Sequence, residues 1–235
     1  VSASFPFLIT QLARLHQNLF EQNILEQIIP NNPLGPVVDA FAKAVQDYGS
    51  TDAVMLMVSQ PAESNRFDQL GLEQLLWEKY KITTVRKTLT EIYENGSLRE
   101  GHLILAGKKV ALTYYRAGYT PDDFRTSVAL KGRQLIEASS TIQVPDLPMQ
   151  LAGMKKIQQV LTHQEMLSAF ASEEISKRFL NTFAAMHTLD EIIETPDGAL
   201  SASEWASRNP EKYVLKPQRE GGGNNYFGKD IPIKM

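Results

Sequence analysis

An uninterrupted apolar segment, Ala53-Val-Met-Leu-Met-Val58, constrains the fold more than any other part of the chain. A strand covered by helices on both faces has no side chain facing solvent, so it lacks the polar alternation of a half-buried strand. The polar residues 59–65 follow, and the pattern then predicts a helix over about Phe67–Tyr80 and a second strand over Ile82–Arg86. This order predicts an α/β fold with a parallel sheet, and it places residues 60–65 at the carboxyl end of a strand, where open α/β sheets bind ligands.

The remaining elements are predicted from periodicity and from helix-start and helix-stop residues. Before the apolar strand we expect a helix over Leu8–Ile29, broken near Gln22-Asn23, and a second helix over Val37–Tyr48 that is closed by Gly49. After it we expect a hairpin of Leu103–Leu105 and Val110–Tyr115, a helix starting at Thr120-Pro121, helices over Met149–Leu161 and Glu173–His187, an irregular surface connection over Asp190–Asn209, and a short strand over Tyr213–Leu215.

Composition excludes several classes of function. The 235 residues carry 24 basic and 27 acidic side chains, which gives a formal net charge of −3. A protein that binds nucleic acid usually carries an excess of basic residues, so this net charge does not favour that function. The sequence has no cysteine, which removes disulfides, thiolate catalysis and zinc–thiolate sites and fits a cytoplasmic location. No apolar run is long enough to span a bilayer, so we expect a soluble protein with no membrane partner. The chain begins at Val1 rather than methionine, as a piece of a longer protein would.

A glycine-rich segment near the carboxyl end is the strongest functional signal. Residues 214–225 read Val-Leu-Lys-Pro-Gln-Arg-Glu-Gly-Gly-Gly-Asn-Asn. Three glycines alone are most often a hinge or linker, and no Lys-Ser or Lys-Thr follows them as in a Walker loop. Here the glycines follow a short strand and stand beside the cations Lys216 and Arg219 and the oxygens of Glu220, which suit phosphate and magnesium. The segment therefore predicts a loop that binds nucleotide phosphates.

Other polar residues are candidates for a substrate site, each with a simpler alternative. Arg116, at the end of a predicted strand and before Gly118, could clamp a carboxylate with its guanidinium fork, or it could be a surface arginine in a turn. Glu63, Asn65 and Gln69 could surround a polar amino-acid ligand, or they could belong to a solvated loop and helix start. One lysine of the pair Lys155-Lys156 could reach a phosphate, or both could simply be solvated on a helix. Ser2 and Ser4 are small polar residues before a helix, and helix capping is their simpler explanation. None of the histidines has metal-ligand spacing, and no catalytic residue is identified.

The candidate segments, taken together, resemble eukaryotic-type glutathione synthetase. Residues 214–225 resemble its glycine-rich ATP loop. The collinear matches upstream are Ser2-Ala3-Ser4, Glu63-Ser64-Asn65, Phe67-Asp68-Gln69, Tyr115-Arg116-Ala117-Gly118-Tyr119 and Gln150-Leu-Ala-Gly-Met-Lys-Lys-Ile-Gln-Gln159. Matches in the family's order over nearly the whole chain are far more specific than any one of them.

The resemblance implies an ATP-grasp ligase that joins γ-glutamylcysteine to glycine through an acyl phosphate, as a cytoplasmic homodimer. The residues that it implies for γ-glutamylcysteine are Ser2, Ala3, Ser4, Glu63, Ser64, Asn65, Gln69, Arg116, Ala117, Gly118 and Tyr119. Those that it implies for ATP are Lys155, Lys216, Pro217, Gln218, Arg219, Glu220, Gly221, Gly222, Gly223, Asn224, Asn225 and Phe227, the last where the family usually has tyrosine. Glu220 would also hold Mg2+.

The resemblance also implies a domain organisation. Residues 1–50 would form a helical part of the ATP-grasp body, 51–150 an inserted α/β substrate-binding domain with a parallel sheet, and 151–235 a partial ATP-grasp domain with the ATP loop. The family's upstream Glu-x-Asn pair of magnesium ligands has no counterpart here, and the match covers only the middle of the enzyme. We therefore expect the isolated chain to be inactive. The alternative is a truncated, non-catalytic fragment that binds substrate or a partner subunit.

Overall fold

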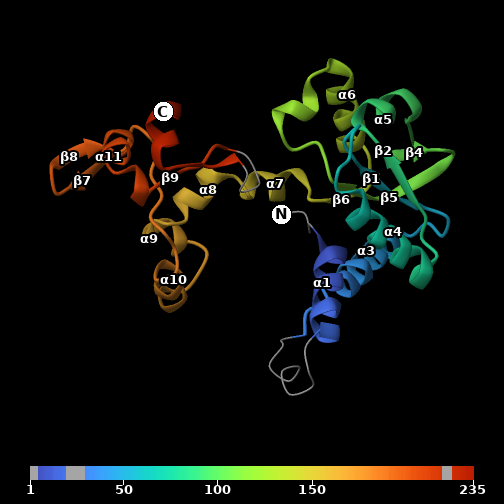
Figure 1. Ribbon diagram of the computed structural model, residues 1–235. Helices are drawn as coiled ribbons and strands as arrows, with labels where there is room; N and C mark the ends of the chain where they lie inside the picture. Colours follow the sequence, from blue (N-terminus) through green and yellow to red (C-terminus); the bar gives the residue numbers. More distant parts are fainter. Residues whose placement is uncertain (1–4, 20–29, 219–223) are drawn as a thin grey trace. The chain divides into compact units, whose positions relative to one another are not determined.

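A computed structural model describes residues 5–19, 30–218 and 224–235 of the chain (Figure 1). These residues fall into two compact units, Val1–Asp146 and Leu147–Met235, and each is described by itself. Within the described ranges, no helix combines the length and the apolar character needed to cross a membrane.

The first unit is built on a six-stranded mixed sheet in the order β2-β1-β5-β4-β3, with β6 paired to β5. The strands are β1 (Val54–Val58), β2 (Thr84–Lys87), β3 (Ser97–Arg99), β4 (His102–Leu105), β5 (Lys108–Tyr115) and β6 (Ile142–Val144). β1 runs parallel to β2 and to β5, and β5 runs parallel to β6, whereas β3, β4 and β5 form an antiparallel meander. The predicted parallel sheet around the apolar strand is confirmed.

Helices cover both faces of this sheet, as Figure 1 shows. On one face lie α1 (Pro6–Leu19), α3 (Leu34–Tyr48) and α4 (Arg66–Tyr80); on the other lie α5 (Leu89–Asn95) and α6 (Ser127–Glu137). Met55 and Met57 point into the first core, while Leu56 and Val58 point into the second. All five residues of β1 are buried because successive side chains of a strand enter opposite cores. This explains why the segment is apolar without interruption.

Two glycines allow helices to approach closely in this unit. A Cβ at Gly132 of α6 would lie 1.9 Å from the carbonyl oxygen of Leu89, at the start of α5. A Cβ at Gly71 of α4 would lie 2.2 Å from the ring of Phe7 in α1. Both distances are far below van der Waals contact, so only glycine permits these packings.

The second unit consists of short helices and two-stranded ribbons. Its elements are α7 (Leu147–Ala152), α8 (Lys155–Val160), α9 (Gln164–Leu167), α10 (Glu173–Leu180), β7 (Ile192–Thr195), β8 (Gly198–Ser201), α11 (Ala202–Arg208), β9 (Val214–Leu215), β10 (Tyr226–Phe227) and α12 (Ile231–Lys234). The described residues also form short 3-10 turns: η1 (Pro121–Phe124) in the first unit, and η2 (Pro210–Lys212) and η4 (Gly228–Asp230) in the second.

The expectation of an irregular connection over Asp190–Asn209 is wrong. The segment forms the β7–β8 hairpin followed by α11. Gly198 turns the hairpin with a φ of +100°, and Thr195 Oγ1 donates a 2.7 Å hydrogen bond to its carbonyl. Ser201 then caps α11 by accepting from the N–H of Glu204. These local turn and cap signals outweighed the polar composition on which the expectation rested.

Several helix boundaries also differ from the sequence prediction. The helix α3 begins at Leu34 rather than at Val37. The helix expected over Met149–Leu161 is divided into α7 and α8, because the chain leaves the helix at Gly153 and Met154 takes an extended conformation with ψ of 149°. The helix expected over Glu173–His187 ends at Leu180. The start expected at Thr120-Pro121 is present, but it opens only the turn η1, since Thr126 caps a new helix, α6, immediately afterwards.

Candidate functional site

The carboxyl ends of three parallel strands meet at one edge of the first unit. The backbone N–H of Arg116 donates to the carbonyl of Val58 at 2.8 Å, and the N–H of Ser59 donates to the carbonyl of Lys87 at 3.1 Å. The sheet's hydrogen bonding therefore continues one residue past β5 and β1. These bonds hold the first loop residue after each strand at a set spacing, which is the arrangement that positions ligand groups in α/β proteins.

Arg116 is buried at this edge, with 6% of its surface exposed. Its Nη1 donates to the hydroxyl of Tyr114 at 3.4 Å, and its guanidinium lies 5.8 Å from the ring centre of Tyr114 and 5.9 Å from that of Phe5. Burial raises the pKa of the Tyr114 hydroxyl, with the nearby Arg116 charge acting in the opposite direction. The alternative of a surface arginine is therefore wrong.

The turn after Arg116 folds back on the strand end. The hydroxyl of Tyr119 donates to the carbonyl of Arg116 at 3.2 Å, and Gly118 has a φ of +94°. Arg133 of α6 donates to the carbonyl of Gly118 at 3.4 Å, and Ala117 is buried. The four residues predicted from the Arg-Ala-Gly-Tyr pattern thus form one compact turn.

Gln69 occupies a buried position in the first turns of α4, with 2% of its surface exposed. Its Oε1 accepts a hydrogen bond from Nη2 of Arg86, at the end of β2. Arg86 also forms an ion pair with Glu73, one helical turn beyond Gln69 on α4. The sequence pattern did not identify Arg86, because it lies inside a predicted strand and 17 residues from Gln69.

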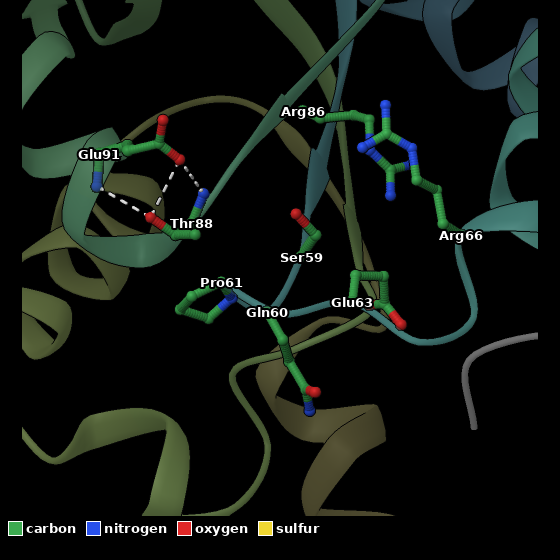
Figure 2. Close-up of a pocket in the computed structure, with 8 residues that line it drawn as sticks. All are labelled: Ser59, Gln60, Pro61, Glu63, Arg66, Arg86, Thr88 and Glu91. Carbon is green, nitrogen blue, oxygen red and sulfur yellow. Dashed lines mark hydrogen bonds between the residues drawn. The ribbon is translucent and has the colours of Figure 1, made fainter.

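A pocket of about 290 Å3 opens beside these residues, at the ends of β1 and β2 (Figure 2). Its lining is polar and consists of Ser59, Gln60, Pro61, Glu63, Arg66, Arg86, Thr88 and Glu91. Among the predicted site residues that the structure describes, only Glu63 lines it. The sequence analysis did not predict the other lining residues. They could have been found by noting that they follow a parallel strand or begin the next helix, which is where α/β proteins place ligand contacts.

Two of the lining carboxylates hold the pocket's loops. Glu63 Oε1 accepts from the backbone N–H of Asn65 at 2.8 Å. Glu91 and Thr88 form a reciprocal capping box at the start of α5, drawn as dashed lines in Figure 2. The pKa of Glu91 is lowered, first by the hydrogen bond from the backbone N–H of Thr88 and also by the neighbouring Lys87.

The other predicted substrate residues lie around the pocket rather than in it. Asn65 is the residue before α4, and its side chain makes no capping bond there. Ser64 is exposed in the same loop. The predicted residues Ser2, Ala3 and Ser4 lie outside the described residues. The structure thus brings Glu63, Gln69 and the turn at Arg116 to the same edge of one sheet.

In the second unit, the glycine-rich segment connects two paired strands. β9 and β10 are antiparallel, with Leu215 opposite Tyr226 and Val214 opposite Phe227. The Oε1 of Gln218 accepts from the backbone N–H of Lys156 at 3.4 Å, which brings this connection to the start of α8, where Lys155 lies. Lys216 and Pro217 follow β9, and Asn224 and Asn225 precede β10. The predicted residues Arg219, Glu220, Gly221, Gly222 and Gly223 lie outside the described residues.

No magnesium site is built from the residues that the structure describes. In those ranges, no three His, Asp or Glu side chains gather closely enough to hold a metal ion. The predicted ligand, Glu220, falls outside them. The binding of Mg2+ to this chain therefore stays a prediction.

The fold and the site define an α/β protein with polar groups gathered at the carboxyl ends of parallel strands, and with a glycine-rich connection suited to a nucleotide. The whole chain, residues 1–235, matches the model of the family described as "Eukaryotic glutathione synthase, ATP binding domain". The chain belongs to this family.

Curated relatives agree with this membership. The chain is 39% identical over 98% of its length to the chloroplastic glutathione synthetase of Solanum lycopersicum, 36% over 98% to the glutathione synthetase of Homo sapiens, and 34% over 100% to that of Xenopus laevis. The matched regions are 42%, 49% and 50% of those proteins, so the chain spans about half the length of the curated relatives.

A solved structure shows the same fold. The apo form of a glutathione synthetase-like effector from Globodera pallida superposes with a TM-score of 0.68 over 99% of this chain and 49% of that one, at 18% identity. At this identity the likeness supports the arrangement of helices and strands alone.

Proposed function

We propose that the chain supplies the γ-glutamylcysteine site and part of the ATP site of a glutathione synthetase. The family membership and the names of the relatives support glutathione synthesis as the activity of the whole protein. The observation that carries the proposal for this chain is the buried Arg116 at the end of β5, beside the pocket at the ends of β1 and β2.

The proposed substrate half uses the edge of the first unit. A buried guanidinium binds a carboxylate through two parallel hydrogen bonds, and such charge-assisted bonds are stronger where water is excluded. Arg116 has this burial, and Tyr114 and Tyr119 restrict its position. Glu63 lines the adjacent pocket and is suited to the ammonium group of an amino acid. We assign the glutamyl end of γ-glutamylcysteine to this edge.

The proposed nucleotide half uses the β9–β10 connection. Lys155 and Lys216 would place positive charge on the phosphates of ATP, and the glycine segment would cover them at little steric cost. Together with an ATP-grasp body, this half would deliver the γ-phosphoryl group to the substrate. The carboxylate oxygen attacks the γ-phosphorus and ADP leaves; the glycine amine then attacks the acyl carbon and inorganic phosphate leaves. The resemblance to the family implies that Glu220 would hold Mg2+.

Calorimetric titration of the 235-residue chain with γ-glutamylcysteine, and separately with a non-hydrolysable ATP analogue and magnesium, tests the proposal. We expect both ligands to bind, and free cysteine, which lacks the glutamyl group, should compete poorly with the dipeptide. A folded chain that binds neither ligand contradicts the proposal. An assay of ADP release with both γ-glutamylcysteine and glycine tests the separate expectation that the isolated chain does not turn over. Steady turnover would refute that expectation.

The assembly and the location are also proposals. We propose that the whole protein is a cytoplasmic homodimer, as the resemblance to the family implies. Sedimentation of the whole protein measures its mass in solution and tests the homodimer. Imaging of a tagged copy in cells tests the cytoplasmic location.

A further inference from the structure

Arg86 joins three groups at the end of β2. Its Nη2 donates to Oε1 of Gln69, its Nη1 donates to the carboxylate of Glu73, and the same nitrogen lies 3.1 Å from the sulfur of Met57. The side chains of Arg86 and Glu73 are only 19% and 17% exposed. The guanidinium is therefore held in one orientation by partners from two different elements, α4 and β1.

This arrangement determines which way the Gln69 amide faces. A side-chain amide has an accepting oxygen and a donating NH2 group, and arginine can only donate. Rotating the amide by half a turn would set the NH2 donors against the guanidinium donors. The oxygen must therefore face Arg86, and the NH2 group must face away from it.

The NH2 group of Gln69 is left with an unused capacity to donate. Its Nε2 is buried and has no hydrogen-bond acceptor among the residues that the structure describes. A buried donor without a partner costs free energy, which an acceptor atom of a bound ligand would offset. Gln69 is one of the residues assigned to the γ-glutamylcysteine site above, so this inference rests on the proposed function.

We propose that Arg86 is a positioning residue of the substrate site: it fixes the Gln69 amide so that its N–H groups meet an acceptor oxygen of the dipeptide. Arg86 acts through Gln69 and does not itself contact the dipeptide. Because Glu73 balances its charge, Arg86 orients the amide without adding net positive charge to the site.

The first experiment compares Arg86→Met with Glu73→Gln by calorimetric titration of γ-glutamylcysteine and an ATP analogue. Both substitutions remove the ion pair, but only Arg86→Met frees the Gln69 amide. We expect Arg86→Met to weaken dipeptide binding by about tenfold, the loss of one oriented hydrogen bond. Glu73→Gln should stay within about twofold of the wild type, and neither substitution should change affinity for the ATP analogue. Equal losses in the two variants would overturn the proposal, because they would trace the effect to the ion pair.

A double-mutant cycle tests whether Arg86 acts through Gln69. In a Gln69→Met background, which keeps the side chain's length, Arg86→Met should cause no further loss of dipeptide affinity. In the chain that retains Gln69, Arg86→Lys should bind the dipeptide more tightly than Arg86→Met does, because an ammonium also donates to the amide oxygen. A full further loss in the Gln69→Met background would show that Arg86 acts independently, and it would overturn the proposal.

Nuclear magnetic resonance tests the orientation without any ligand. In protein labelled with 15N at glutamine, the side-chain protons of Gln69 should exchange slowly and show no close contact with the guanidinium protons of Arg86. Fast exchange or strong contacts to the guanidinium would overturn the proposal. A wild-type chain that fails to bind the dipeptide would instead contradict the proposed function and the ligand part of this inference. The resonances would still decide the orientation of the Gln69 amide.

Discussion

The carboxylate of Asp68 accepts a 3.0 Å hydrogen bond from the backbone N–H of Leu8, 60 residues earlier in the chain. Leu8 lies in the first turn of α1, where backbone N–H groups have no partner within the helix. Asp68 is buried in the first turn of α4 and serves as a cap for a distant helix. This bond holds the start of α1 against α4, on the same face of the sheet as Arg116 and Tyr114.

We expect Asp68→Ala to destabilise the protein by about 1–2 kcal/mol, because it removes the acceptor that caps the part-buried N–H of Leu8 at the start of α1. Urea unfolding followed by circular dichroism measures the change. Asp68→Asn retains an accepting oxygen and should cost less. Equal stability of Asp68→Ala and the wild type would show that the bond contributes nothing.

Gly132→Ala should destabilise the protein by about 1–3 kcal/mol, since its Cβ would lie 1.9 Å from the carbonyl oxygen of Leu89 and force α6 away from α5. The matched control is Gly35→Ala in α3, where the nearest neighbour of the new Cβ is Asn32 Nδ2 at 3.5 Å, an ordinary van der Waals distance. The control should be neutral or raise stability by less than about 1 kcal/mol. Thermal melts of the two variants should move apart; melts that fall together would contradict the packing.

Stability should depend on the charge of Glu91. Its pKa is lowered in the folded protein from 4.5, first by the N–H of Thr88. A lowered carboxyl pKa stabilises the fold at pH values above 4.5, and the contribution disappears as the pH falls through the folded pKa. The difference in unfolding free energy between the wild type and Glu91→Gln should therefore be constant near neutral pH and shrink in acid. A difference that does not change between about pH 7 and pH 3 would show that the ionised form is not favoured.

Arg116→Lys should weaken binding of γ-glutamylcysteine by about 10- to 100-fold, because a lysine ammonium cannot reproduce the two parallel bonds of a guanidinium. Affinity for ATP should not change. Arg125→Lys is the control, since the side chain of Arg125 is 76% exposed and forms an ion pair with Asp122 at 3.1 Å. Calorimetric titration of both variants is the measurement, and equal affinities would remove Arg116 from the site.

Lys216→Gln should lower affinity for ATP by about tenfold through the loss of one charge on the phosphates, with dipeptide binding unchanged. Lys212→Gln, an exposed lysine before β9, serves as the control for the loss of one positive charge. Fluorescence titration with a labelled ATP analogue measures the affinity of each variant. If both substitutions weaken binding equally, the effect is one of overall charge and Lys216 has no specific role.

The sequence by itself determined the elements whose signals are local. The unbroken apolar segment predicted β1, helical spacing and Gly49 predicted the end of α3, and the strand–helix–strand order predicted a parallel sheet with a site at its carboxyl edge. These signals act over a few residues, through side-chain burial and backbone conformation. The hairpin at β7–β8 escaped prediction because its strands are short and half exposed.

Only the tertiary structure decided which polar side chains meet. Arg86 reaches Gln69 because β2 lies parallel to β1 and α4 crosses between them, and Arg116 is buried because β5 pairs with β1 on its other side. Asp68 accepts from Leu8 because α1 packs closely on α4 at Gly71. Such contacts depend on the register of strands and the closeness of helices, which are set by the packing of both cores at once rather than by any short stretch of the chain.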